Sequence, residues 1–149
     1  EWSITANYTY LNGELVQSVS DKCLAQPGTG TCTNSVANPD PLKGAKLANT
    51  PEHSGSLFTT SALPFGLTLG YGVTYQGKFA FSAAASGVVY SDPYWVHNAF
   101  VSYKVTPALT AQLNVKNFTD ELYYTRIRNN GWATPGDARA AVLSLNYSF

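Results

Sequence analysis

The sequence predicts an all-β protein, an antiparallel meander of six strands. Apolar and polar residues alternate with a period of two in several stretches, as they do when successive side chains of a strand point to opposite faces. The links between these stretches are alternately long and short along the 149-residue chain. No run of about 18 apolar residues is present, so a crossing of the membrane would have to be made by strands.

We expect the strands near residues 2–16, 53–63, 67–78, 94–105, 109–125 and 138–149, with helix nearly absent. The clearest alternation runs from Leu67 to Gln76, where large apolar residues alternate with Thr, Gly and Gln. Glycines on the polar face of this strand would leave space in a lumen, whereas they would weaken a packed sandwich. The face of strand 53–63 that looks outward is not assigned by its pattern.

The links predict which strand ends share a side. A long loop runs from Asn12 to about Pro51, and two further loops cover 78–92 and 126–137, whereas 64–66 and 106–108 are short turns. Short turns are periplasmic and long loops extracellular in membrane barrels, so both chain ends are expected on the periplasmic side. Aromatic residues would form a lower girdle, Trp2, Tyr103, Tyr147 and Phe149, and an upper one, Tyr8, Tyr10, Tyr71, Tyr75, Tyr94, Trp95, Tyr123 and Tyr124.

Composition excludes several classes of protein. Charged residues are 12% of the chain, hydrophobic residues 44%, and the formal net charge is zero. A nucleic-acid partner is not expected, because phosphate binding needs basic patches. Disorder needs low hydrophobicity and high charge, which this chain lacks. Because Glu1 opens directly into strand pattern without a signal peptide, we expect a mature or excised piece that is incomplete.

Cys23 and Cys32 lie in the first long loop with eight residues between them. A polar loop without a second ligand cluster favours a disulfide over a metal pair. The bridge would constrain the loop by roughly 3 kcal/mol on the chain-entropy model. The pair therefore predicts an oxidising compartment, either the periplasm or the cell surface.

Two segments and the chain's last strand carry a resemblance to a known family. The segment 114–124 reads NVKNFTDELYY and the segment 131–139 reads GWATPGDAR, followed by an alternating strand that ends on Tyr147-Ser148-Phe149. In this order they resemble the carboxyl end of TonB-dependent outer-membrane receptors. The segments 53–60 and 93–94 resemble the preceding strands of that family. The resemblance covers about the last hundred residues well and the first fifty weakly.

The resemblance implies that residues 1–149 are the carboxyl-terminal part of a receptor barrel, the last six of about 22 strands, in the bacterial outer membrane. The plug domain of such receptors would not be in this chain. The implied function is uptake of a ferric siderophore of the catecholate type, with the iron complex as substrate and no cofactor. The implied partners are the TonB complex acting through the plug, the barrel-assembly machinery reading Tyr147 and Phe149, and outer-membrane lipid and lipopolysaccharide.

Two other functions are compatible with the residue pattern. One is a small complete outer-membrane barrel of porin or adhesin type, and the other is a soluble extracellular β-sandwich that acts as a binding module. Detergent partition would distinguish the sandwich from either barrel, and the upstream coding sequence would distinguish the two barrels.

The candidate ligand-binding residues are Arg126, Arg128, Trp132, Tyr90 and Tyr94, in and beside the second and third long loops. Arginine and tryptophan would offer positive charge and a flat aromatic face to an anionic ferric complex. The alternative is that the two arginines pair with lipopolysaccharide phosphate or nearby acids, and that Arg139 is structural. No catalytic residues are expected, because no nucleophile or paired-carboxylate motif is present. His53 and His97 are too far apart in sequence to predict a metal site.

Overall fold

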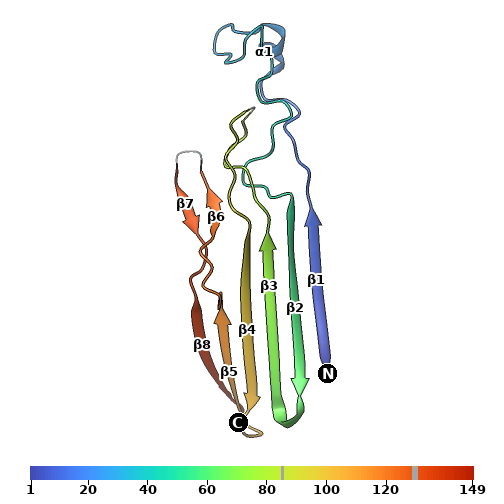
Figure 1. Ribbon diagram of the computed structural model, residues 1–149, viewed down its shortest axis with the longest axis vertical. Coiled ribbons are helices and arrows are strands. Elements are labelled where there is room, and N and C mark those ends of the chain that lie inside the picture. Colours follow the sequence, from blue (N-terminus) through green and yellow to red (C-terminus); the bar gives the residue numbers. More distant parts are fainter. Residues whose placement is uncertain (85, 129–130) are drawn as a thin grey trace.

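The main feature of the protein is one twisted antiparallel sheet (Figure 1). We describe it from a computed structural model of residues 1–84, 86–128 and 131–149. The sheet has the order β1-β2-β3-β4-β5-β8, and a separate two-stranded hairpin, β6-β7, stands beyond β5 and β8. The strands are β1 (Trp2–Tyr10), β2 (His53–Leu63), β3 (Leu67–Gln76), β4 (Tyr94–Lys104), β5 (Leu109–Lys116), β6 (Tyr124–Ile127), β7 (Ala133–Pro135) and β8 (Ala140–Tyr147). The predicted antiparallel meander is confirmed. Residues 85, 129 and 130, in the second and third predicted loops, lie outside the described residues.

Both short turns lie at one end of the sheet, together with the two chain termini (Figure 1). The first turn is the 3-10 helix η1 (Pro64–Gly66), in which Phe65 and Gly66 have φ angles of 65° and 75°. In the second, the Thr106 hydroxyl accepts a hydrogen bond of 3.0 Å from the Leu109 N–H. The predicted sharing of one end by turns and termini is therefore confirmed.

The register separates an apolar face from a polar face across all six strands. One row on the apolar face runs through Ile4, Thr59, Tyr71, Ala99, Val115 and Ala141. The neighbouring row on the polar face runs through Ser3, Thr60, Gly70, Phe100, Asn114 and Val142. Because side chains alternate, the apolar face also carries most of the predicted girdle aromatics, Trp2, Tyr8, Tyr10, Tyr71, Tyr75, Trp95, Tyr103 and Tyr147.

Three of the aromatics predicted for the upper girdle do not join it. Tyr94 pairs with Gln76 and so projects from the polar face. Tyr123 and Tyr124 lie beyond the end of β5, outside the six-stranded sheet. The ring of Tyr123 packs on Tyr94, with 4.6 Å between centroids. Strand-end position alone did not reveal which face these residues occupy.

Two predicted strands were too long. The first ends at Tyr10 instead of residue 16, because the chain leaves the sheet after Leu11, whose N–H donates to the Glu52 carbonyl at 2.9 Å. The fifth ends at Lys116 instead of residue 125, because Asn117 turns the backbone into the left-handed region at φ 45°. The β6-β7 hairpin within the third loop was not predicted. The other strand ends agree with the prediction to within two residues.

The first long loop is a folded unit that projects above the sheet (Figure 1). Its base is closed by the Leu15 N–H donating to the Ala45 carbonyl at 2.9 Å and by the Gly44 N–H donating to the Leu15 carbonyl at 2.7 Å. Its outermost part holds the short helix α1 (Asp21–Ala25), where the Ser20 hydroxyl caps the first turn by accepting from the Cys23 N–H at 3.4 Å. The predicted near absence of helix is confirmed for the described residues.

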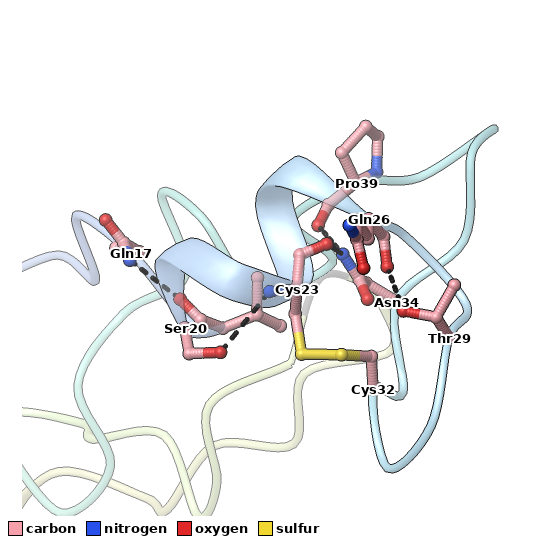
Figure 2. The surroundings of a disulfide bond; sticks show 9 residues. Gln17, Ser20, Cys23, Gln26, Thr29, Cys32, Asn34 and Pro39 are labelled. Carbon is pink, nitrogen blue, oxygen red and sulfur yellow. Dashed lines mark hydrogen bonds between the residues drawn. A yellow bond between two sulfur atoms is a disulfide. The ribbon is translucent and has the colours of Figure 1, made fainter.

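The Cys23–Cys32 disulfide is formed, as the sequence predicted (Figure 2). Beside it, the Asn34 side-chain amide donates to the Cys23 carbonyl at 2.7 Å and to the Pro39 carbonyl at 2.8 Å. Asn34 is 4% exposed, so these hydrogen bonds are shielded from water. The bridge and the buried amide together connect α1 to the returning part of the loop.

The buried apolar side chains of the described residues lie in the first and second outer loops and at the start of β4. They are Ala45, Phe79, Ala80, Tyr94 and Val96. Both faces of the sheet are open in this chain, so large apolar residues such as Ile4, Leu143 and Leu145 are more than half exposed. The described residues contain no helix with the length and apolar character needed to span a membrane.

Candidate functional site

The three outer loops meet at Asn49. Its N–H donates to the Ala80 carbonyl of the second loop at 2.8 Å, and its side-chain carbonyl accepts from the Ile127 N–H of β6 at 3.1 Å. Asn49 has φ 53°, a left-handed conformation that Asn tolerates better than most residues. One residue therefore ties the end of the first loop to both the second and the third.

Beside this junction lies an open hollow of about 380 Å³ lined by Ala48, Asn49, Phe81, Ser82, Ala83, Arg126 and Arg128. We call it the rim hollow. Arg126 lies on β6 and Arg128 directly follows the end of this strand, and both line the hollow. The structure thus brings the two predicted arginines together in one hollow, and their role in ligand binding stays a prediction.

The positive charge in the rim hollow is not neutralised by the part of the chain that the structure describes. Its ion pairs are Lys46 with Glu14 at 3.6 Å, Lys46 with Glu52 at 2.8 Å, and Arg139 with Asp120 at 3.2 Å. Neither Arg126 nor Arg128 belongs to one of these pairs. A guanidinium offers several planar donors to oxygen anions, so the hollow can attract and orient an anion.

An aromatic ring completes the hollow from the second loop. Phe81 lies next to the buried Phe79, whose ring centroid is 6.4 Å away and which is 1% exposed. The loop is held across its width by the Phe81 N–H donating to the Val89 carbonyl at 3.0 Å and the Ser91 N–H donating to the Phe79 carbonyl at 2.9 Å. Phe81 is therefore presented by a fixed segment of the second loop.

The other predicted ligand residues lie outside the rim hollow. Trp132 is 74% exposed, and its carbonyl accepts from the Arg128 N–H at 2.8 Å across the hairpin. Tyr90 is 43% exposed and lies under Lys78, whose Nζ is 5.0 Å from the ring centroid. Tyr94 is 8% exposed. Tyr90 and Tyr94 line a neighbouring hollow of about 200 Å³ that shares Phe81 with the rim hollow.

Two other cations near the outer loops, Lys46 and Arg139, form ion pairs with acids. Arg139, for which a structural role was the alternative prediction, pairs with Asp120 at an exposed position. The hydrogen bond and the charge of Lys46 hold the pKa of the Glu52 carboxyl below its usual value, and the same hydrogen bond raises the pKa of Lys46. This pair closes the base of the first loop, whereas Arg126 and Arg128 belong to no ion pair among the described residues.

Sequence reasoning missed Asn49 and Phe81. Nothing in the local pattern around Asn49 marks a junction, because its partner Ile127 is 78 residues away in sequence. Phe81 carried a weak signal, since the segment 79–81 reads Phe-Ala-Phe. Only the packing of the first and second loops against each other brings Phe81 to the rim hollow.

Two other groups of predicted residues also have defined positions. Tyr147 and Phe149 make an edge-to-face ring pair with centroids 5.2 Å apart, and their role as an assembly signal stays a prediction. The Nδ1 atoms of His53 and His97 lie 2.7 Å from the hydroxyls of Tyr8 and Tyr71 respectively. The described residues contain no cluster of three or more groups suited to a metal ion.

Comparison with known proteins shows the family to which a chain with this sheet and these outer loops belongs. The family model described as TonB dependent receptor-like, beta-barrel matches residues 1–118. The chain belongs to this family. Membership places it in the bacterial outer membrane, with the apolar face of the sheet toward lipid and the polar face toward the lumen. The number of strands in the complete barrel stays a prediction.

Three receptors are similar in sequence to this chain. The chain is 32% identical over 150 residues to the probable TonB-dependent siderophore receptor PiuA of Acinetobacter baumannii, covering 100% of this chain and 19% of PiuA. It is 31% identical over 108 residues to the catecholate siderophore receptor Fiu of Escherichia coli K12, covering 70% of this chain and 14% of Fiu. It is 32% identical over 111 residues to the metal-pseudopaline receptor CntO of Pseudomonas aeruginosa, covering 72% and 16%.

Solved structures show the same arrangement. The crystal structure of PiuA matches with a TM-score of 0.75 at 30% identity, covering 98% of this chain and 19% of that one. The closed form of Fiu, a ferric-catecholate import receptor, matches with a TM-score of 0.68 at 26% identity, covering 99% and 19%. The chain spans less than a fifth of the length of the relatives it matches.

Proposed function

We propose that this chain forms wall and outer rim of a receptor that takes up a ferric siderophore, most closely one of the catecholate type. The observation that carries the proposal is the rim hollow, where two uncompensated arginines stand next to Phe81. The relatives PiuA and Fiu, named as siderophore and catecholate receptors, support the same substrate class. This function is favoured over a porin, an adhesin and a soluble sandwich by membership of the receptor family.

The chemistry of a ferric tricatecholate suits this hollow. The metal carries three positive charges and three doubly ionised catechols carry six negative ones, so the complex is a trianion with aromatic rings on its surface. Arg126 and Arg128 would supply donors to the catechol oxygens, and Phe81 would supply a ring for stacking. Trp132 and Tyr90, both exposed, would add contacts at the edge. Tyr94 would act through Tyr123 as a support, because it is buried.

Transport itself would need no bond to be made or broken by this chain. The proposed sequence is capture at the rim, transfer inward, and energised movement of a plug domain by the TonB complex. The plug, the assembly machinery that would read Tyr147 and Phe149, and lipopolysaccharide are partners of the whole receptor. The substrate, not a resident cofactor, would bring the iron.

The test is an affinity measurement on assembled full-length receptor. The double variant Arg126→Ala/Arg128→Ala should weaken binding of a ferric tricatecholate by about 1–3 kcal/mol, and Trp132→Ala should weaken it less. The charge-matched control is Lys22→Ala/Lys43→Ala, which removes two exposed cations from the first loop. Binding should be unchanged in this control.

A second probe separates charge from shape. A ferric trihydroxamate is electrically neutral, because three singly charged hydroxamates balance the metal. Loss of the arginines should therefore lower tricatecholate affinity far more than any trihydroxamate affinity, and the difference should shrink at high salt. Equal tricatecholate affinity for the arginine double variant and the wild-type receptor would remove the rim hollow from the site.

A further inference from the structure

Asn117 ends β5 and is almost completely buried, with 1% of its surface exposed. Its φ of 45° lies in the left-handed region, which Asn tolerates better than most other residues with a side chain. This asparagine belongs to the NVKNFTDELYY segment that carries the family resemblance. The rim hollow does not use it, so the segment needs a separate physical explanation.

The Asn117 side chain joins the two connections that lead to the β6-β7 hairpin. Its amide donates to the Glu121 carbonyl at 2.9 Å and to the Asp137 carbonyl at 3.0 Å, and its side-chain carbonyl accepts from the Glu121 N–H at 2.9 Å. Glu121 lies just before β6, and Asp137 lies just after β7. One buried amide therefore holds the outgoing and returning chain together.

The same residue is fixed to the wall of the barrel. The Asn117 N–H donates to the side-chain carbonyl of Asn98 on β4 at 3.0 Å. The next N–H, of Phe118, donates to the His97 carbonyl at 3.0 Å. The position of the hairpin base is consequently set by β4 as well as by β5.

Above Asn117 the two connections stay in close contact. We call residues 117–123 and 136–139 the neck; Figure 1 shows it between the ends of β5 and β8 and the hairpin. The Gly136 N–H donates to the Tyr123 carbonyl at 2.8 Å, and the Asp137 N–H donates to the Tyr123 hydroxyl at 3.1 Å. A β carbon on Gly136 would fall 2.0 Å from Cζ of Tyr123, so only glycine admits this ring.

Buried and exposed contacts of the neck differ in how much they contribute to its stability. The Asp120–Arg139 ion pair spans the neck on the outside, and both side chains are more than half exposed. Exposed ion pairs contribute little because water screens them. A buried amide with both its atoms hydrogen-bonded is costly to remove, because its partners lose their hydrogen bonds away from water.

We propose that Asn117 is a positioning residue for ligand capture, which sets the direction of the β6-β7 hairpin and thereby the placement of Arg126 and Arg128. The inference rests on the proposed function of the rim hollow. Asn49 holds the far end of the hairpin through Ile127, and Asn117 holds its base. With the base released, the hairpin would sample several directions, and binding would then have to order it.

The experiment uses two variants in the full-length receptor. Asn117→Gly keeps the left-handed backbone accessible and removes the amide. Asn117→Asp keeps an acceptor for the Glu121 N–H and turns the donor into an oxygen facing two carbonyls. The matched control is Asn146→Asp on exposed β8. Heat-modifiable mobility on gels, which reports barrel assembly, should be unchanged in all three.

Two readouts test the positioning role. Amide hydrogen exchange of residues 118–128 and 131–137, measured without ligand, should accelerate by about tenfold or more in both Asn117 variants, while β8 stays protected. The Kd for a ferric tricatecholate should rise by about tenfold, because ordering the hairpin on binding costs free energy. The Asn146→Asp receptor should match wild type in both measurements.

The outcomes separate this inference from the proposed function. If the arginine double variant binds weakly and both Asn117 variants exchange and bind like wild type, the positioning role is overturned and the rim hollow stands. Faster exchange without a change in Kd, in a receptor that does depend on the arginines, also overturns it. If the arginine double variant binds normally, the proposed function fails. In that case the inference is overturned as well if the Asn117 variants show faster hairpin exchange but an unchanged Kd.

Discussion

The ring of Phe100 lies directly over the backbone of Gly70 on the neighbouring strand. A β carbon built on Gly70 would fall 1.9 Å from Cε1 of that ring. Phe58 lies beside it, with 6.3 Å between the two ring centroids, and covers Gly72, where a β carbon would be 3.2 Å from Cδ2. The glycines of β3 therefore make room for two aromatic rings on the lumenal face.

The first prediction concerns this pair. Gly70→Ala should destabilise the assembled full-length receptor by about 1–3 kcal/mol, because the added methyl group forces the ring of Phe100 from its place. The measurement is the denaturant midpoint of the folded barrel. The cost of Gly70→Ala should largely vanish in a Phe100→Ala background, whereas Thr68→Ala, on the same face of β3, should cost the same in both backgrounds. Equal cost of Gly70→Ala with and without Phe100 would contradict the close contact.

The Gly70–Phe100 pair also shows which features of the fold can be predicted from the sequence. The period of two in β3 and β4 correctly separated two faces, because alternation is a local property. The same alternation places Phe100 on the polar face of β4. That Gly70 lies opposite Phe100 depends on the pairing of β3 with β4, which no local pattern encodes. The end of β5 was missed for the same reason. Apolar residues continue past Lys116, and only the hydrogen bonds of Asn117 to Glu121 and Asp137 show why the strand stops.

The candidate site divides along similar lines. Arg126 and Arg128 were predicted because their spacing within one short segment is visible in the sequence. Phe81 and Asn49 could not be predicted, because they join the arginines only through the packing of separate loops. Tyr94 was predicted as a ligand contact from its place beside the second loop, and its burial against Tyr123 depends on a segment nearly thirty residues away.

The second prediction concerns the Cys23–Cys32 bridge. Opening it by reduction, or by Cys23→Ser/Cys32→Ser, should loosen the tip of the first loop, because closing this ring is worth roughly 3 kcal/mol on the chain-entropy model. Protease cleavage between residues 20 and 40 should accelerate while the folded barrel keeps its denaturant midpoint. Wild-type protein under oxidising conditions is the control. Two alkylatable thiols on the unreduced protein would contradict the bridge.

The third prediction concerns the pH dependence of the loop base. Lys46 lowers the pKa of Glu52, so the pair stabilises the loop above the usual carboxyl pKa of about 4.5 and this contribution is lost as the pH falls through the lowered value. At high pH the pair depends on Lys46, whose pKa is raised. Its stabilisation of the loop is complete below the usual lysine pKa of 10.5 and is lost only above that pH. Between these limits the base should be insensitive to pH.

Amide exchange at Leu15 and Gly44, which close the loop base, is the measurement. Exchange rates, corrected for their intrinsic pH dependence, should rise below about pH 4.5 in wild type. Glu52→Gln should remove this acid response, and Glu14→Gln, which affects only the longer 3.6 Å pair, should largely retain it. An acid response of equal size in the Glu52→Gln protein would show that another group controls the loop base.

The unbroken pairing register of the wall strands limits where residues can be inserted or deleted. Ten successive residue pairs join β2 to β3, and ten more join β3 to β4, without a bulge. Removing a single residue inside β3 would turn each following side chain to the opposite face, placing Thr and Gln against lipid and Tyr in the lumen. The wall can therefore diverge by substitution, whereas insertions and deletions are confined to the loops. Changes in loop length can then give such receptors new binding surfaces without altering the face they present to the membrane.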